Sequence, residues 1–189
     1  MLHERKYPRL DTAYYAQLHV PCSITIAVKE RKEIFGFAHD AFTKAALEIV
    51  RRVGAGLTPQ QRSDTRSDPT LLADTRSDPT VQISIPIHIA LFMPDHVHLC
   101  IEASPSKNII QFVQEIKSRI AVEAAHQGYP ASFWQRSFFD HFLRKEEKLS
   151  TVIRYILNNP CRAKLASPWW EYPYWYSNQY TMEQLKNLE

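Results

Sequence analysis

Apolar and polar residues are spaced along the chain in two ways, and the first of these predicts β-strands. Four segments are rich in aromatic and β-branched residues or alternate apolar and polar positions: 12–28, 81–92, 96–103 and 132–144. The turn residues Pro94 and Asp95 separate the middle two, so this pair is expected to form a β-hairpin. Pro86 cannot donate a ladder hydrogen bond, which predicts a sheet edge or a bulge at that point.

The second spacing predicts helices, because apolar residues recur every three to four positions in three segments: 38–53, about 106–127 and 145–160. Asp40 and Ser106 are expected N-caps of the first two. In the third, Glu146 and Glu147 are expected in the first turn, and Pro160 is expected to end the helix. Helices mixed with hairpin strands predict an α+β sandwich, with helices on one face of a mainly antiparallel sheet.

Residues 57–80 follow neither pattern. The sequence SDTRSDPT at 63–70 returns as ADTRSDPT at 73–80, and the unit is polar and contains proline. Two copies are too few for a solenoid, and the unit buries too little apolar surface to offset its ordering entropy. We therefore expect one domain, residues 1–189, interrupted by a flexible insertion at about 57–80. A binding arm is the alternative for this segment.

The composition suits a globular protein, with 44% hydrophobic and 23% charged residues among 189. No apolar run has the roughly 18 residues of a membrane helix, and the N-terminus lacks the apolar core of a signal peptide. Three cysteines, far apart in sequence, are expected to be free thiols, so we expect a cytoplasmic protein without membrane contact. A net charge of +3 permits nucleic-acid binding without requiring it.

The segment MPDHVHLC contains two histidines at a spacing of two. In a strand, residues i and i+2 lie on the same face, so His96 and His98 are expected to project together while Val97 turns to the other face. Two imidazoles on one face can bind a divalent cation. Two alternatives remain open: the histidines are solvated polar residues, or Cys100 joins them in a structural zinc site.

The last predicted helix carries further polar chemistry. At about 100° per residue, Lys148, Tyr155 and Asn159 lie along one margin of its apolar stripe. A tyrosine, an amide and two histidines are the components of metal-assisted phosphoryl transfer through a covalent intermediate. The alternative is a tyrosine that only packs against the sheet.

Three blocks, MPDHVHL, FWQRSFFDHFLR and YILNNPCRAKL, resemble in order the signature blocks of the HUH single-tyrosine transposases. The branch that the sequence resembles most is the REP-associated tyrosine transposases, and the resemblance covers roughly residues 5–56 and 81–177. Asp95 stands where asparagine is frequent in the family, and the insertion at 57–80 is outside its pattern.

The resemblance implies a ferredoxin-like fold. It also implies cleavage and strand transfer of single-stranded or hairpin DNA, such as REP-type repeats, through a 5′-phosphotyrosine. It places the nucleophile at Tyr155 and the ligands of Mg²⁺ or Mn²⁺ at His96, His98 and Asn159. Two questions stay open at this point. The chain could be a hairpin-binding protein of the same fold that no longer cuts, and it could act as a monomer or a homodimer.

Basic side chains interleaved with aromatic ones suit a single strand with stacked bases. The candidate DNA-binding residues are Arg5, Lys6, Arg9, Lys117, Arg119, Arg136, Arg144 and Lys148. For any one of them, an ordinary solvated position is the alternative. The C-terminal tail, 167–189, is rich in aromatic residues, and we expect it to dock on the core rather than to serve only as a base-stacking platform.

Overall fold

The computed structural model describes residues 11–56, 84–130 and 132–188. A five-stranded sheet with the order β4-β1-β3-β2-β5 forms its centre, and neighbouring strands are antiparallel. The strands are β1 (Cys22–Ala27), β2 (Ile87–Met93), β3 (His96–Ile101), β4 (Phe139–Phe142) and β5 (Trp175–Tyr176). The α-helices are α1 (Asp40–Gly54), α2 (Ile109–His126), α3 (Leu149–Leu157), α4 (Asn159–Arg162) and α5 (Met182–Lys186). The antiparallel α+β class predicted from the sequence is confirmed.

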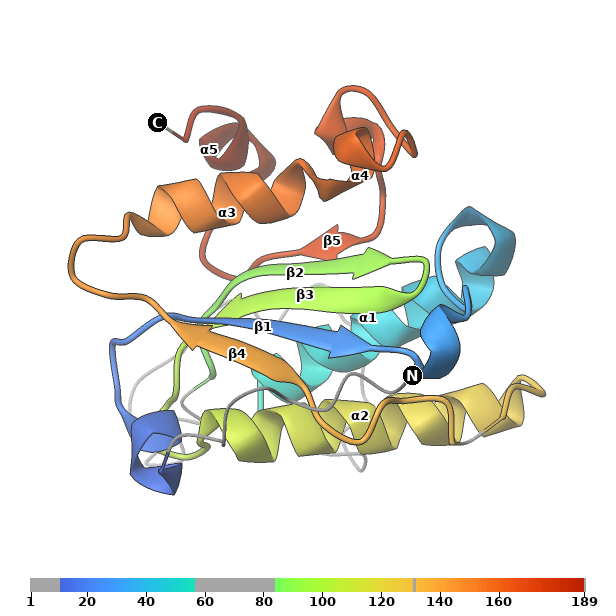
Figure 1. Ribbon diagram of the computed structural model, residues 1–189, viewed down its shortest axis with the longest axis horizontal. Helices are drawn as coiled ribbons and strands as arrows, with labels where there is room; N and C mark the ends of the chain where they lie inside the picture. Colours follow the sequence, from blue (N-terminus) through green and yellow to red (C-terminus); the bar gives the residue numbers. More distant parts are fainter. Residues whose placement is uncertain (1–10, 57–83, 131, 189) are drawn as a thin grey trace, which may run out of the picture.

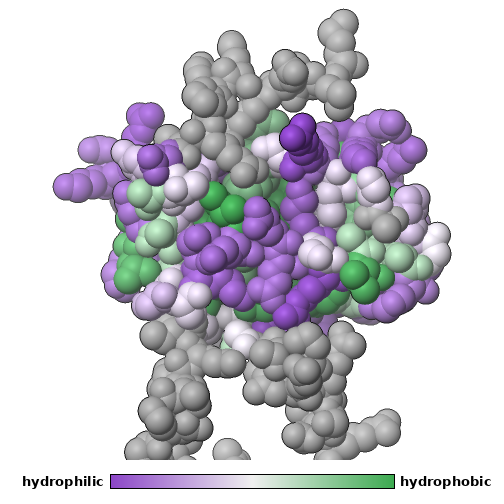
Figure 2. Space-filling model, turned by 90° about the horizontal axis from the view of Figure 1, so that it is seen from below, coloured by the Kyte–Doolittle hydropathy of each residue, from purple (hydrophilic) through white to green (hydrophobic). Residues whose placement is uncertain are grey.

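Helices cover both faces of this sheet. The long helices α1 and α2 lie together on one face, as expected, and α3 crosses the other face over β2 and β3 (Figure 1). All seven residues of β2 are buried, which requires cover on both sides. Seen from the side of α1 and α2, hydrophilic residues occupy the middle of the described surface (Figure 2). The sequence pattern predicted helices on one face of the sheet. It did not reveal that a third helix, α3, covers part of the second face.

The core between the sheet and α1 is aromatic. Phe92 of β2 makes an edge contact with Phe35 at 5.1 Å between ring centroids, and Phe35 stacks on Phe42 of α1 at 5.3 Å. Phe92 therefore points to the α1 side, and the neighbouring Leu91 points to the opposite side. Because Leu91 is paired with His98, the histidine lies on the α3 side of the sheet.

The β2–β3 hairpin has the predicted turn at Pro94-Asp95. The pairing register shifts between Ile87 and Ile89, directly after Pro86, so the predicted irregularity is confirmed as a bulge. The bulge therefore follows Pro86, which has no backbone N–H to donate to the neighbouring strand.

The aromatic tail is docked, as predicted. The Tyr172 hydroxyl donates a hydrogen bond of 2.8 Å to the carbonyl of Phe92, and the Tyr174 hydroxyl donates one of 2.8 Å to the carboxylate of Asp40. Strand β5 pairs with β2 and closes that edge of the sheet. Lys44 and Tyr174 together hold the pKa of Asp40 below its usual value.

Several predicted boundaries were wrong. Segment 12–28 was expected to be one strand, but it begins with a 3-10 helix, Thr12–Ala16, and the strand covers only Cys22–Ala27. The strand expected at 132–144 is limited to β4. Asp40 is the first residue of α1 and not its cap, which is His39. A carboxylate in the first turn still complements the helix dipole.

The N-cap of α2 is Asn108 instead of Ser106. Asn108 and Gln111 form a capping box, with hydrogen bonds of 2.9 and 3.0 Å, which satisfies two amide donors at once. The Ser106 hydroxyl lies 3.1 Å from that of Ser104. Asn108 caps the helix because the capping box satisfies the backbone N–H groups of both Asn108 and Gln111, whereas a single serine cap would satisfy one.

Helix α3 begins at Leu149, later than expected. Glu147 lies before it and accepts hydrogen bonds from the backbone N–H of Arg144 and the ring of His141, at 2.7 and 2.9 Å. Pro160 does not end α3, which stops at Leu157; it sits in the first turn of α4, where its missing N–H has no partner to lose.

The insertion expected at 57–80 lies outside the described residues. Within the described parts of the chain, no helix is long and apolar enough to cross a membrane.

Candidate metal and nucleophile site

The two histidines of β3 converge on the face that α3 crosses. The Nε2 atoms of His96 and His98 lie 3.0 Å apart, and their ring centroids are separated by 4.6 Å. The predicted shared face is therefore confirmed. Val97 and Leu99 are buried on the other side of the sheet.

Each ring is held by its other nitrogen. The Nδ1 of His96 lies 2.5 Å from the Asp95 carboxylate, which can only accept, so His96 carries its proton there. The Nδ1 of His98 lies 3.1 Å from the hydroxyl of Thr25, its direct partner on β1. When Thr25 accepts from that nitrogen, both Nε2 lone pairs face the same point. Outer partners of this kind orient histidine ligands in metal sites.

This geometry fits a divalent cation. Two nitrogens bound at right angles to one octahedral ion at about 2.1 Å would lie about 3.0 Å apart, which matches the observed separation of 3.0 Å. Burial, with the nearby His96, Arg162 and Arg31, lowers the pKa of His98 to about 3, so its ring is neutral at physiological pH. A neutral imidazole is the form that binds metal.

Tyr155 and Asn159 lie one turn apart, on α3 and at the start of α4. Tyr155 is 54% exposed, whereas Ile153, Ile156 and Leu157 of the same helix are buried. The Asn159 amide nitrogen donates to the carbonyls of Tyr155 and Ile156 at 3.0 and 3.1 Å, and its oxygen accepts no hydrogen bond within the described chain. That oxygen is the atom a cation would bind. No hydrogen bond joins either side chain to the histidine pair in the described residues.

The zinc interpretation is wrong. Across the residues that the structure describes, no three His, Cys, Asp or Glu side chains come together in a way that could hold a metal ion. Cys100 is completely buried, and burial raises the pKa of its thiol to about 12. Cys100 packs in the hydrophobic core.

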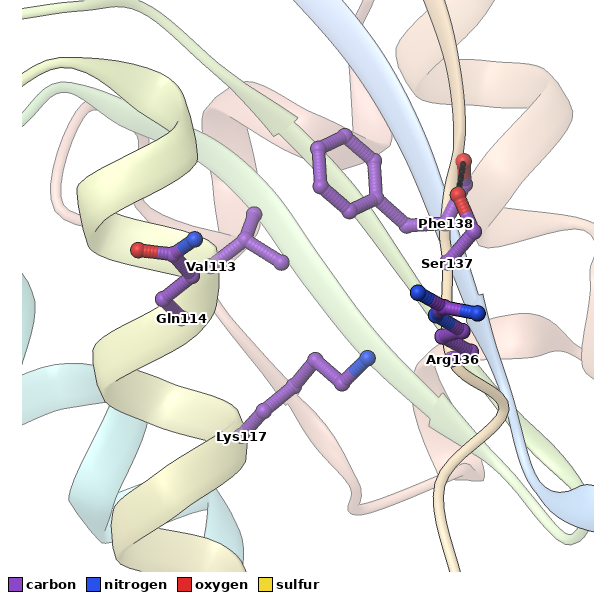
Figure 3. A pocket seen from close by; sticks show the side chains of 6 residues that line it. All are labelled: Val113, Gln114, Lys117, Arg136, Ser137 and Phe138. Atoms are coloured by element: carbon purple, nitrogen blue, oxygen red, sulfur yellow. Dashed lines mark hydrogen bonds between the residues drawn. The ribbon is translucent and has the colours of Figure 1, made fainter.

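The basic candidates do not form one surface with this site. Lys117 and Arg136 line a cavity of about 540 Å³ between α2 and the segment before β4, on the sheet face away from α3 (Figure 3). Lys117 donates a hydrogen bond of 2.8 Å to the carbonyl of Gln135. Arg119 is paired with Glu115 at 2.6 Å, which favours an ordinary surface position.

Arg144 and Lys148 are exposed in the loop before α3 and at the cap of that helix. Arg5, Lys6 and Arg9 lie outside the described residues.

Two residues next to the site were not predicted from the sequence. Thr25 needed the β1–β3 register, and Arg162 falls on the face of Tyr155 only when the helical turn is continued past Pro160.

An antiparallel α+β sandwich with a His-Val-His pair on a central strand and a tyrosine on the crossing helix has the features expected of single-tyrosine transposases. Residues 78–159 match the family model "Transposase IS200 like". The resemblance that the three sequence blocks indicate is thereby confirmed.

One solved structure shows the same fold. A REP-associated tyrosine transposase bound to a REP hairpin superposes with a TM-score of 0.57 at 16% identity, covering 91% of this chain and 82% of that one. A candidate transposase from Deinococcus radiodurans aligns with a TM-score of 0.42 at 17% identity, over 84% of this chain and 97% of the other. No curated protein matches the chain in sequence.

Proposed function

We propose that the protein cleaves and rejoins single-stranded DNA beside hairpins, using Tyr155 as the nucleophile. The observation that carries this proposal is the pair of Nε2 atoms 3.0 Å apart on the sheet face crossed by the tyrosine-bearing helix. A hairpin-binding protein needs no such pair, whereas metal-assisted phosphoryl transfer needs side chains that bind the metal. The hairpin bound by the similar REP-associated transposase supports hairpin DNA as the partner.

Different residues of this chain bind the metal, orient its ligands and supply the nucleophile. His96, His98 and the Asn159 oxygen would hold a Mg²⁺ or Mn²⁺ ion, whose positive charge would stabilise the scissile phosphate as it gains negative charge. Asp95 and Thr25 fix the two rings in the orientation that points their Nε2 atoms together. The exposure of Tyr155 leaves its hydroxyl open to an extended strand.

The chemical step exchanges one phosphate ester for another. The Tyr155 oxygen loses its proton and forms a bond to phosphorus, and the bond between phosphorus and the 3′ oxygen breaks. The 3′ oxygen takes up a proton as the free hydroxyl, while the downstream strand stays attached through a 5′-phosphotyrosine. Because one ester replaces another, a second 3′-hydroxyl can reverse the step without an energy source.

The test is a covalent adduct on a hairpin oligonucleotide labelled at its 3′ end. With Mn²⁺, the wild-type protein should carry the label, and Tyr155→Phe should bind the DNA but carry none. Tyr14→Phe is a matched control, since Tyr14 is 46% exposed and lies outside the site. An adduct that persists in Tyr155→Phe would refute the assignment. Tight binding by the wild-type protein without any adduct would favour the protein that binds and does not cut.

A further inference from the structure

Arg162 lies over the ring of Tyr155. Its guanidinium carbon is 4.7 Å from the ring centroid, within the range of a cation–π contact. The two residues are seven positions apart, and the backbone of Asn158 between α3 and α4 stays near helical values, with φ of −81° and ψ of −2°. Tyr155, Asn159 and Arg162 therefore share one side of the chain, as residues i, i+4 and i+7 do in a helix.

The guanidinium of Arg162 keeps its donors available. It makes no ion pair and no side-chain hydrogen bond with any residue that the structure describes, and it is exposed. Arg31, by contrast, is paired with Asp95 at 3.3 Å and is thus partly neutralised. The charge of Arg162 has no carboxylate partner in the described chain.

The charge of Arg162 lies directly on the candidate nucleophile. An exposed cation with no carboxylate partner in the described chain attracts an anion. A guanidinium is suited to a phosphate because its planar N–H groups can bind two oxygens while its face remains stacked on an aromatic ring.

We propose that Arg162 joins the nucleophile to its target: its face holds the ring of Tyr155, and its N–H groups bind the scissile phosphate of single-stranded DNA. This inference rests on the proposed function and adds a residue to it. One side chain then fixes the distance between the attacking oxygen and the phosphorus atom. The cation–π contact limits the rotation of an otherwise exposed tyrosine.

The first experiment measures DNA binding without cleavage, in a Tyr155→Phe background that keeps the aromatic ring. Each phosphate contact contributes about 0.7 to the slope of log affinity against log salt for a single strand. Arg162→Gln should therefore reduce the magnitude of this slope by about 0.7, and Arg162→Lys should retain it. Arg154→Gln, an exposed arginine on α3 outside the Tyr155 side, should leave it unchanged. An unchanged slope in Arg162→Gln would overturn the phosphate contact.

The second experiment measures the rate of adduct formation with Tyr155 intact. Removing one charged donor from a phosphoryl-transfer site costs on the order of 100-fold in rate, so Arg162→Gln should be slowed to that degree. Arg162→Lys should recover part of the rate. If the wild-type protein forms the adduct and Arg162→Gln forms it equally fast, only the role of Arg162 is wrong. If the wild-type protein forms no adduct, the proposed function fails, and the salt slope still tests the phosphate contact.

Discussion

Replacing Thr25 by valine tests whether the histidine pair is built to bind metal. Valine keeps the β-branched shape of threonine and suits the strand, so the change removes one oxygen. That oxygen lies 3.1 Å from the Nδ1 of His98. Without it, the largely buried ring nitrogen loses its partner, at a cost of about 1–3 kcal/mol in the free energy of unfolding. For a chain of this size, we expect a fall in Tm of roughly 2–12 °C.

The larger effect should be on metal affinity. Losing the partner that orients a histidine ligand weakens metal binding by about 10–100-fold, so the Mn²⁺ concentration that gives half-maximal adduct formation should rise by that factor. Thr25→Ser keeps the hydroxyl and should stay near the wild-type value. We would measure adduct yield and thermal melting across a Mn²⁺ series for all three proteins. A Mn²⁺ dependence in Thr25→Val equal to that of the wild type would refute this role of the hydroxyl.

Two further predictions concern the fold. A short Gly-Ser linker in place of residues 57–80 should leave Tm and DNA binding almost unchanged, because the flanking elements are already joined by a 2.9 Å backbone hydrogen bond from Ile85 to Gly54; a large fall in Tm would contradict this. In the metal-free protein, the pKa of His98 is lowered by folding. Between about pH 6.5 and pH 3, His98 is therefore protonated in the unfolded chain but neutral in the folded chain. Stability should therefore be complete above about pH 6.5 and fall toward pH 3, and His98→Gln should show a smaller loss in melting experiments over this range.

Local chemistry made some parts of this structure predictable. The hairpin around Pro94-Asp95 could be predicted because a turn signal separates two alternating segments, and alternation alone placed His96 and His98 on one face. The three segments with apolar residues at helical spacing were correctly predicted to form helices, which are α1, α2 and α3.

Helix boundaries and cross-strand partners were less accessible. The Asn108 capping box and the late start of α3 depend on hydrogen bonds that several nearby residues could have formed. Strand β5 has two residues and depends on docking, not on its own pattern. Thr25 could be recognised as a partner of His98 only from the register of β1 on β3. Long-range pairing decides these features, and a one-dimensional pattern does not contain it.

The closure of the sheet edge by β5 has a consequence for how the chain is made. Strand β2 is buried throughout and apolar except at His88, and Leu91 pairs at the sheet edge with Trp175, more than 80 residues later in the sequence. At roughly 5–20 residues per second of synthesis, this edge would wait about 4–16 s for its cover. An apolar strand with open backbone groups is a template for intermolecular pairing. The hazard of aggregation is therefore concentrated on the ribosome, before the last aromatic residues emerge.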